Sequence, residues 1–171
     1  EERIRAISMS ADEMKSSGVT GLADYVADPA LLDSIFDLGF RSVLFLETIG
    51  FQEEKAEAVA AEVEAILKNH ESNCNIGIAP HAPYSVSAKL WQRLDQLAKK
   101  YGCLLSTHLA ETDEEIQFIE KGRGPLVDLL KDRQVFDMNW RVPGMTPARY
   151  LKSMNVLSGT VAVHCNFIDY D

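Results

Sequence analysis

Three of the four histidines end or directly follow short apolar runs typical of β-strands: His81 in A-P-H-A-P-Y, His108 in T-H-L-A-E and His164 in V-H-C. Ligands of parallel α/β folds bind at the carboxyl ends of strands, so these imidazoles are expected to converge on one mouth of the sheet. An imidazole there can bind a metal or move a proton. A lone histidine is more often a satisfied or exposed residue, but three at equivalent positions are harder to explain that way. His70 lies in a polar connection and is expected to be solvated.

Glu111 lies three residues after His108, just past the same apolar run, so both side chains can turn toward the same mouth. A carboxyl group held partly out of water can be tuned to transfer a proton at neutral pH. Alternatively, Glu111 only caps the following helix, where an acidic side chain favours the positive end of the helix dipole. The spacing leaves both possibilities open. Glu47 and Asp24 also end strands and are weaker candidates for the mouth.

The composition is that of an acidic globular protein. The chain has 171 residues, of which 46% are hydrophobic and 25% charged, and its net charge is −9. This length predicts a single domain over residues 1–171. The deficit of Lys and Arg argues against nucleic acid and against an anionic membrane surface, and no run approaches the roughly 18 apolar residues of a membrane span. The odd, widely spaced Cys74, Cys103 and Cys165, with no visible secretory signal, predict a reducing, cytoplasmic setting.

Helical periodicity alternates along the chain with continuous apolar runs. Helices are expected over residues 3–16, 29–38, 52–69, 87–100, 113–121, 125–132 and 146–154. Strands are expected over residues 19–25, 42–47, 75–80, 103–108 and 160–165. Apolar strands separated by helices predict a parallel α/β sheet. A five-stranded doubly wound sheet fits the length, whereas a (β/α)₈ TIM barrel typically needs about 250 residues, so the chain would be part of one. Length favours the first architecture, and the residues at the strand ends favour the second.

Three motifs resemble the amidohydrolase superfamily of metal-dependent hydrolases: A-P-H-A-P-Y-S-V-S at 79–87, S-T-H-L-A-E-T at 106–112 and V-H-C at 163–165. They are most similar to the chlorohydrolase and deaminase branch, which includes S-adenosylhomocysteine, methylthioadenosine and aminofutalosine deaminases. Residues 122–130 and 140–151 resemble that branch's segment between its fifth and sixth strands. The resemblance covers essentially the whole chain, and H-A-P-Y combined with H-L-A-E is more specific than either alone.

The resemblance implies a (β/α)₈ barrel that holds one divalent metal, usually Zn²⁺. His108 would be the metal ligand from the fifth strand, and His164 would orient and help deprotonate the metal-activated water. Glu111 would pass a proton to a ring nitrogen, and His81 would hydrogen-bond the substrate. A Lewis-acidic metal lowers the pKa of its water toward about 7. The implied reaction is hydrolytic deamination, or dechlorination, of a small nitrogen heterocycle such as an adenosine-type nucleoside.

The family's H-x-H pair from the first strand and its Asp after the eighth are not among these 171 residues, so the strands should be barrel strands two to six. Because a catalytic zinc needs about three protein ligands and only His108 matches one, we expect these residues alone to bind no catalytic metal and to be inactive. Unpaired edge strands predict homo-oligomeric or domain-exchanged association. Two alternatives are a truncated or degenerate barrel acting as a non-enzymatic interaction module, and a doubly wound small-molecule binder.

Overall fold

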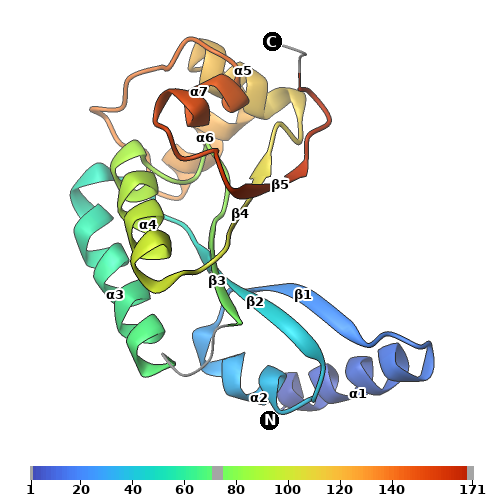
Figure 1. The fold of residues 1–171 in the computed structure, drawn as a ribbon. Helices are drawn as coiled ribbons and strands as arrows, with labels where there is room; N and C mark the ends of the chain where they lie inside the picture. The colour runs from blue at the N-terminus through green and yellow to red at the C-terminus, as the bar shows by residue number, and fades with distance from the viewer. Residues whose placement is uncertain (1, 71–74, 169–171) are drawn as a thin grey trace.

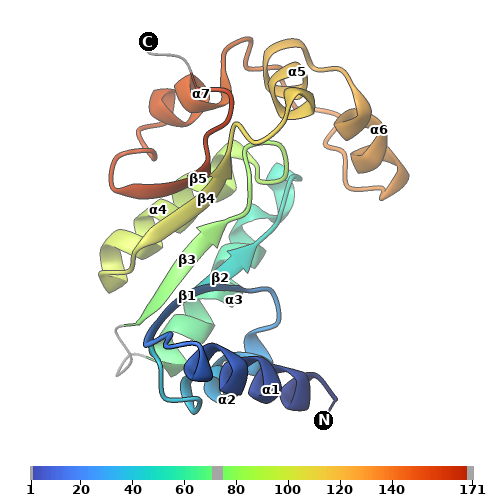
Figure 2. The same cartoon turned by 90° about the vertical axis from the view of Figure 1, so that its right-hand side faces the viewer.

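The five strands lie side by side in the order in which they occur in the chain. The computed structural model describes residues 2–70 and 75–168, so Cys74 lies outside the described residues. One sheet, in the order β1-β2-β3-β4-β5, is formed by β1 (Gly21–Val26), β2 (Arg41–Thr48), β3 (Ile76–Pro80), β4 (Leu105–Leu109) and β5 (Thr160–His164). Every neighbouring pair of strands is parallel. A doubly wound sheet reverses its strand order at a switch point, so that alternative is wrong. The curved sheet in Figures 1 and 2 is part of a (β/α)₈ barrel.

The helices occupy the connections between these strands. They are α1 (Glu2–Ser16), α2 (Leu32–Phe36), α3 (Ala56–Asn69), α4 (Ala88–Tyr101), α5 (Asp113–Lys121), α6 (Pro125–Asp132) and α7 (Pro147–Ser153). Short 3₁₀ turns, η1 (Pro29–Leu31) and η2 (Glu53–Lys55), precede α2 and α3. Helix α3 contacts β2 and α4 contacts β3. In Figure 2, α5, α6 and α7 gather beyond the carboxyl ends of β4 and β5, at the opposite end of the molecule from α1 and α2.

Alternation along the strands divides their side chains between two faces of the sheet. Leu44 and Leu46 of β2 are buried in the core that the sheet forms with α3 and α4. Burying one such side chain stabilises the fold by roughly 1.5–3 kcal/mol. Successive side chains of a strand point to opposite faces, so Phe45 and Glu47 lie on the inner, concave face of the half-barrel. The inner face therefore carries the side chains that could do chemistry.

Helix caps hold the loops that follow β3 and β4. At the start of α4, the Ser87 hydroxyl accepts a hydrogen bond from the Leu90 N–H group, and at the start of α5, the Thr112 hydroxyl accepts one from the Glu115 N–H group. Each cap of this kind contributes about 1 kcal/mol. The two helices thus begin at defined residues, and their caps fix the preceding loops at the carboxyl end of the sheet.

Strands β1 and β5 form the two edges of the described sheet. Val161 of β5 is 50% exposed, and three of the six residues of β1 are exposed. Exposed strand edges can pair with another chain, and the association expected from the sequence remains a prediction. In the described segments, no helix has both the length and the apolar character needed to cross a bilayer. Cys103 and Cys165 are partly buried free thiols.

Candidate active site

The carboxyl ends of four neighbouring strands bring five ionisable side chains together: Glu47, His81, His108, Glu111 and His164. The ring centroids of His81 and His108 lie 5.2 Å apart, and those of His108 and His164 lie 5.1 Å apart. Since β3, β4 and β5 are parallel neighbours, these strands end at the same edge of the sheet. The convergence of the three imidazoles expected from the sequence is confirmed.

A tight turn at the end of β5 aims His164 into this group. His164 pairs in register with Leu109, whose side chain is buried on the helix-covered face, so regular strand geometry would point His164 the same way. His164 instead has a left-handed φ of 73°. The Cys165 N–H group donates a hydrogen bond to the Val163 carbonyl at 3.2 Å, and this bond closes a tight turn with His164 at its centre. Such conformations are costly and cluster at active sites. The turn places His164 Nε2 3.1 Å from His108 Nδ1.

His108, His164 and Glu111 form a continuous row of polar groups. His164 Nε2 lies 3.4 Å from Glu111 Oε1, and the second nitrogen of His108, Nε2, lies 3.9 Å from Glu47 Oε1. The side chains become more exposed along the row, from 19% for His108 to 33% for His164 and 39% for Glu111. The row therefore leads from a half-buried imidazole to a carboxylate that faces solvent, an arrangement that can transfer protons.

A buried carboxylate positions Glu111. Glu115 is fully buried, and its two carboxylate oxygens accept hydrogen bonds at 3.0 Å from the N–H groups of Ala110 and Glu111. Burial raises the pKa of Glu115, and the two backbone hydrogen bonds oppose that rise. Ala110 has a left-handed φ of 49°, which turns the chain between β4 and α5. The residue that caps α5 is Thr112, not Glu111. The side chain of Glu111 faces His164.

His81 is held by the loop that follows β3. Its Nδ1 lies 2.7 Å from the Ser85 hydroxyl oxygen, and that hydroxyl donates its own hydrogen to the Ala82 carbonyl at 3.2 Å. His81 Nδ1 must therefore be the donor, which leaves Nε2 as the nitrogen with a free lone pair in the neutral ring. Burial lowers the pKa of His81, with Glu47 opposing that shift. Tyr84 packs edge-on against His81 at 5.7 Å, and burial raises the pKa of its phenol.

Tyr25 of β1 forms the floor of this group and has no distinguishing motif in the sequence. Its hydroxyl lies 2.5 Å from the Ser106 hydroxyl, which donates to the Val161 carbonyl at 3.1 Å, so Tyr25 is the donor in their shared bond. The Tyr25 ring lies 5.0 Å from His108 and 5.7 Å from Phe45. The alternation of inner-face residues in β1 and β2 is the sequence signal that could have suggested this position, because Tyr25 and Phe45 are paired in register.

The donors in this group suit a divalent metal. Glu47, His81 and His108 each offer one ligand atom, and these atoms all lie within 4.8 Å of one another. Imidazole nitrogens with a carboxylate oxygen are a common zinc ligand set. The family resemblance predicts His108 as a metal ligand, and the structure brings two further possible donors beside it. Asp24 is exposed, and its carboxylate accepts a hydrogen bond from the neighbouring Tyr25 N–H group at 2.8 Å.

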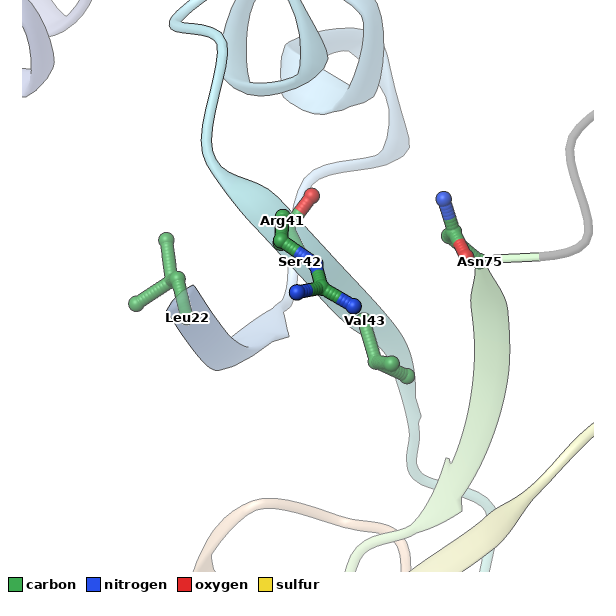
Figure 3. Close-up of a pocket in the computed structure, with 5 residues that line it drawn as sticks. All are labelled: Leu22, Arg41, Ser42, Val43 and Asn75. Carbon is green, nitrogen blue, oxygen red and sulfur yellow. The ribbon is translucent and has the colours of Figure 1, made fainter. Parts of the chain in front are cut away.

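A separate hollow of about 430 Å³ lies at the opposite end of the strands. Figure 3 shows its lining, which comes from β1, β2 and the residue before β3: Leu22, Arg41, Ser42, Val43 and Asn75. These residues lie near the amino ends of β2 and β3, whereas ligands of parallel barrels bind at the carboxyl ends. The hollow is therefore not part of the candidate active site.

Comparison with known proteins agrees with this geometry. Residues 6–165 match the amidohydrolase family. The chain is 29% identical over 168 residues to an aminodeoxyfutalosine deaminase of Deinococcus radiodurans, covering 91% of this chain and 40% of that protein. It is 36% identical over 122 residues to a 5′-deoxyadenosine deaminase of Methanococcus aeolicus, covering 68% of this chain and 28% of that protein. The chain thus spans 40% or less of these two relatives.

Two solved structures contain the arrangement of this chain within part of their length. The crystal structure of Helicobacter pylori aminofutalosine deaminase superposes with a TM-score of 0.80 at 26% identity, covering 97% of this chain and 42% of that chain. An adenosine deaminase from Xanthomonas campestris with bound zinc superposes with a TM-score of 0.61 at 20% identity, covering 93% of this chain and 33% of that chain, and so shares the fold. Sequence motifs, fold and site geometry agree: the chain belongs to the amidohydrolase family.

Proposed function

We propose that residues 1–171 form one structural unit, barrel strands two to six, of a metal-dependent enzyme that deaminates an adenosine-type nucleoside. The observation that carries this proposal is the row His108–His164–Glu111, with neighbouring polar atoms 3.1 and 3.4 Å apart at the ends of β4 and β5. Relatives described as aminodeoxyfutalosine and 5′-deoxyadenosine deaminases support the choice of substrate class.

Each residue of the row has a distinct task. His108 would be one ligand of a divalent metal, and the chemistry that such a metal would supply is to lower the pKa of a water toward about 7. His164, whose Nε2 lies between His108 and Glu111, is the residue that would accept a proton at Nε2 during the attack of water. Glu111 delivers a proton to a ring nitrogen of the heterocycle, which makes the carbon bearing the amino group easier to attack. The N–H groups of Ala110 and Glu111 donate hydrogen bonds to the Glu115 carboxylate, and these bonds hold the side chain of Glu111 at the mouth.

His81 binds the substrate. Because its Nδ1–H group is donated to Ser85, the ring is fixed in one orientation and presents Nε2 as a hydrogen-bond acceptor. Burial lowers the pKa of His81 and so favours this neutral form. An N–H or O–H group of a nucleoside is a suitable donor to it.

The test is an activity assay of the full-length protein loaded with zinc. Adenosine, methylthioadenosine and 5′-deoxyadenosine are offered, and conversion of the adenine ring to hypoxanthine is followed by ultraviolet absorbance. Glu111→Gln should lower kcat by about 10²–10⁴-fold, whereas Glu114→Gln, exposed on α5, should not change it. Failure to deaminate any of these nucleosides, or full activity of Glu111→Gln, would overturn the proposal. Residues 1–171 alone are expected to show no turnover.

A further inference from the structure

Tyr84 lies in the loop that follows β3, and the proposed reaction gives its hydroxyl group no task. The side chain is partly buried and stands three positions after His81. We propose that Tyr84 is a specificity-determining residue, whose hydroxyl donates a hydrogen bond to a hydroxyl group on the sugar of the substrate. This inference rests on the proposed function and names the group that recognises the sugar.

The Tyr84 hydroxyl is available to a ligand. Among the residues that the structure describes, none forms a hydrogen bond with it. A buried tyrosine usually finds a partner for its O–H group. Two other tyrosines of this chain follow that rule, because Tyr25 is bonded to Ser106 and Tyr101 donates to Glu64 at 3.1 Å.

The charges around the Tyr84 phenol place it at the mouth of the sheet. Burial raises the pKa of this phenol, and the carboxylates of Glu115, Glu111 and Glu47 add to the rise. Glu47 belongs to β2, whereas Glu111 follows β4, so the phenol lies within reach of charges on two sides of the mouth. The hydroxyl also keeps its proton at neutral pH and is therefore a hydrogen-bond donor.

The packing of the Tyr84 ring fixes where its hydroxyl lies. The ring stands edge-on to His81, with the centroids 5.7 Å apart and an interplanar angle of 89°. It also packs against the apolar cluster that contains the buried rings of Phe51 and Phe118. A tyrosine side chain has only two rotatable bonds, so little conformational freedom remains to be lost when a ligand binds.

The place of Tyr84 in its loop favours the sugar over the base. The catalytic row and His81 lie at or next to the ends of strands, where the base must lie for its amino-bearing carbon to react. Strand β3 ends at Pro80, so Tyr84 stands farther along the loop, toward the rim. The sugar is the part of a nucleoside that extends from the base toward that rim, and its hydroxyl oxygens accept hydrogen bonds.

The experiment compares substrates and variants in the full-length protein loaded with zinc. Steady-state kinetics are measured with adenosine and with its 2′-deoxy, 3′-deoxy and 5′-deoxy analogues. The sugar keeps its bonds during deamination, so loss of this hydrogen bond should raise KM and leave kcat unchanged. Tyr84→Phe keeps the ring and should raise KM for adenosine about 3–10-fold. Tyr101→Phe, on the outer helix α4, should leave KM unchanged.

The analogues identify the partner of the hydroxyl. With the unaltered enzyme, one analogue should show kcat/KM about 3–10-fold below that of adenosine, and Tyr84→Phe should remove most of that difference. A merely structural role would instead weaken all four substrates by the same factor.

Four results with an active enzyme overturn this inference and leave the deaminase assignment standing. They are an unchanged KM of Tyr84→Phe for adenosine, a fall in its kcat alone, losses that multiply for every analogue, and an unaltered enzyme that loses less than about twofold with all three analogues. The last comparison needs no variant and decides the matter even if Tyr84→Phe does not fold. An unaltered enzyme that deaminates none of the four nucleosides overturns the proposed function and this inference together.

Discussion

Replacing Gly77 of β3 with alanine adds one methyl group, which should disturb the packing of the Phe45 ring beneath the candidate site. A Cβ atom there would lie 2.6 Å from Cε1 of the Phe45 ring and 3.0 Å from the Leu104 carbonyl oxygen. Carbon atoms in contact prefer about 3.5–4.0 Å. The carbonyl cannot retreat freely, because it accepts a hydrogen bond from the Ile78 N–H group at 2.9 Å. In Gly77→Ala the Phe45 ring must therefore move by about 1 Å.

The cost follows from what surrounds that ring. Phe45 is 6% exposed and stacks on Tyr25, which in turn contacts His108. Overpacking a buried site lowers the free energy of unfolding by about 1–3 kcal/mol. Replacing glycine by alanine raises it by about 0.4–1 kcal/mol, because alanine restricts the unfolded chain. Gly77→Ala should lower the free energy of unfolding by about 1–2 kcal/mol. For a chain of this size the melting temperature should fall by roughly 2–8 °C.

The assay is equilibrium unfolding in urea, combined with a double-mutant cycle. Phe45→Leu makes room beside Gly77, so Gly77→Ala should cost about 1 kcal/mol less in that background than in the unaltered chain. A Gly77→Ala variant as stable as the parent would show that the ring is not confined. An equal penalty in both backgrounds would show that Phe45 is not the obstacle.

Two further predictions concern tyrosines. Tyr25→Phe removes the donor to Ser106 and should lower the free energy of unfolding by about 0.5–1.5 kcal/mol in urea titrations; an unchanged midpoint would contradict the bond across the floor. Burial raises the pKa of Tyr150 to about 12, so the folded state keeps a proton that the unfolded state releases near pH 10. Stability should therefore fall as pH rises from 10 toward 12, and Tyr150→Phe should remove that part of the decline; identical pH profiles would refute the assignment.

Much of the fold follows from local patterns in the chain. The continuous apolar runs predict the five strands, and the central strands β2, β3 and β4 show the reason, since a strand covered on both faces tolerates few polar residues. His81, His108 and His164 converge because parallel strands end at one edge. The expected helix over residues 29–38 is shorter, a 3₁₀ turn followed by α2 that ends at Phe36. Short helices are marginal on their own, so tertiary contacts decide where they end.

The finer geometry of the site depends on curvature, which local patterns do not encode. Tyr25 reaches Ser106 because the sheet curls until β1 and β4 face each other across the inner side. The aim of His164 depends on a left-handed φ that nothing in V-H-C predicts, since such conformations favour glycine. The spacing of Thr112 and Glu115 is typical of a capping box, yet the Glu115 carboxylate accepts hydrogen bonds from the N–H groups of Ala110 and Glu111 instead.

The sequential strand order also bears on how the molecule folds. Each strand lies beside its predecessor in the chain, so the sheet can grow one strand at a time as synthesis proceeds. The bond between Tyr25 and Ser106 joins residues 81 positions apart and can close only after β4 has been made. Such distant closure is slow compared with pairing of adjacent units. We therefore expect a nascent chain to acquire its layered framework first and its reactive mouth last.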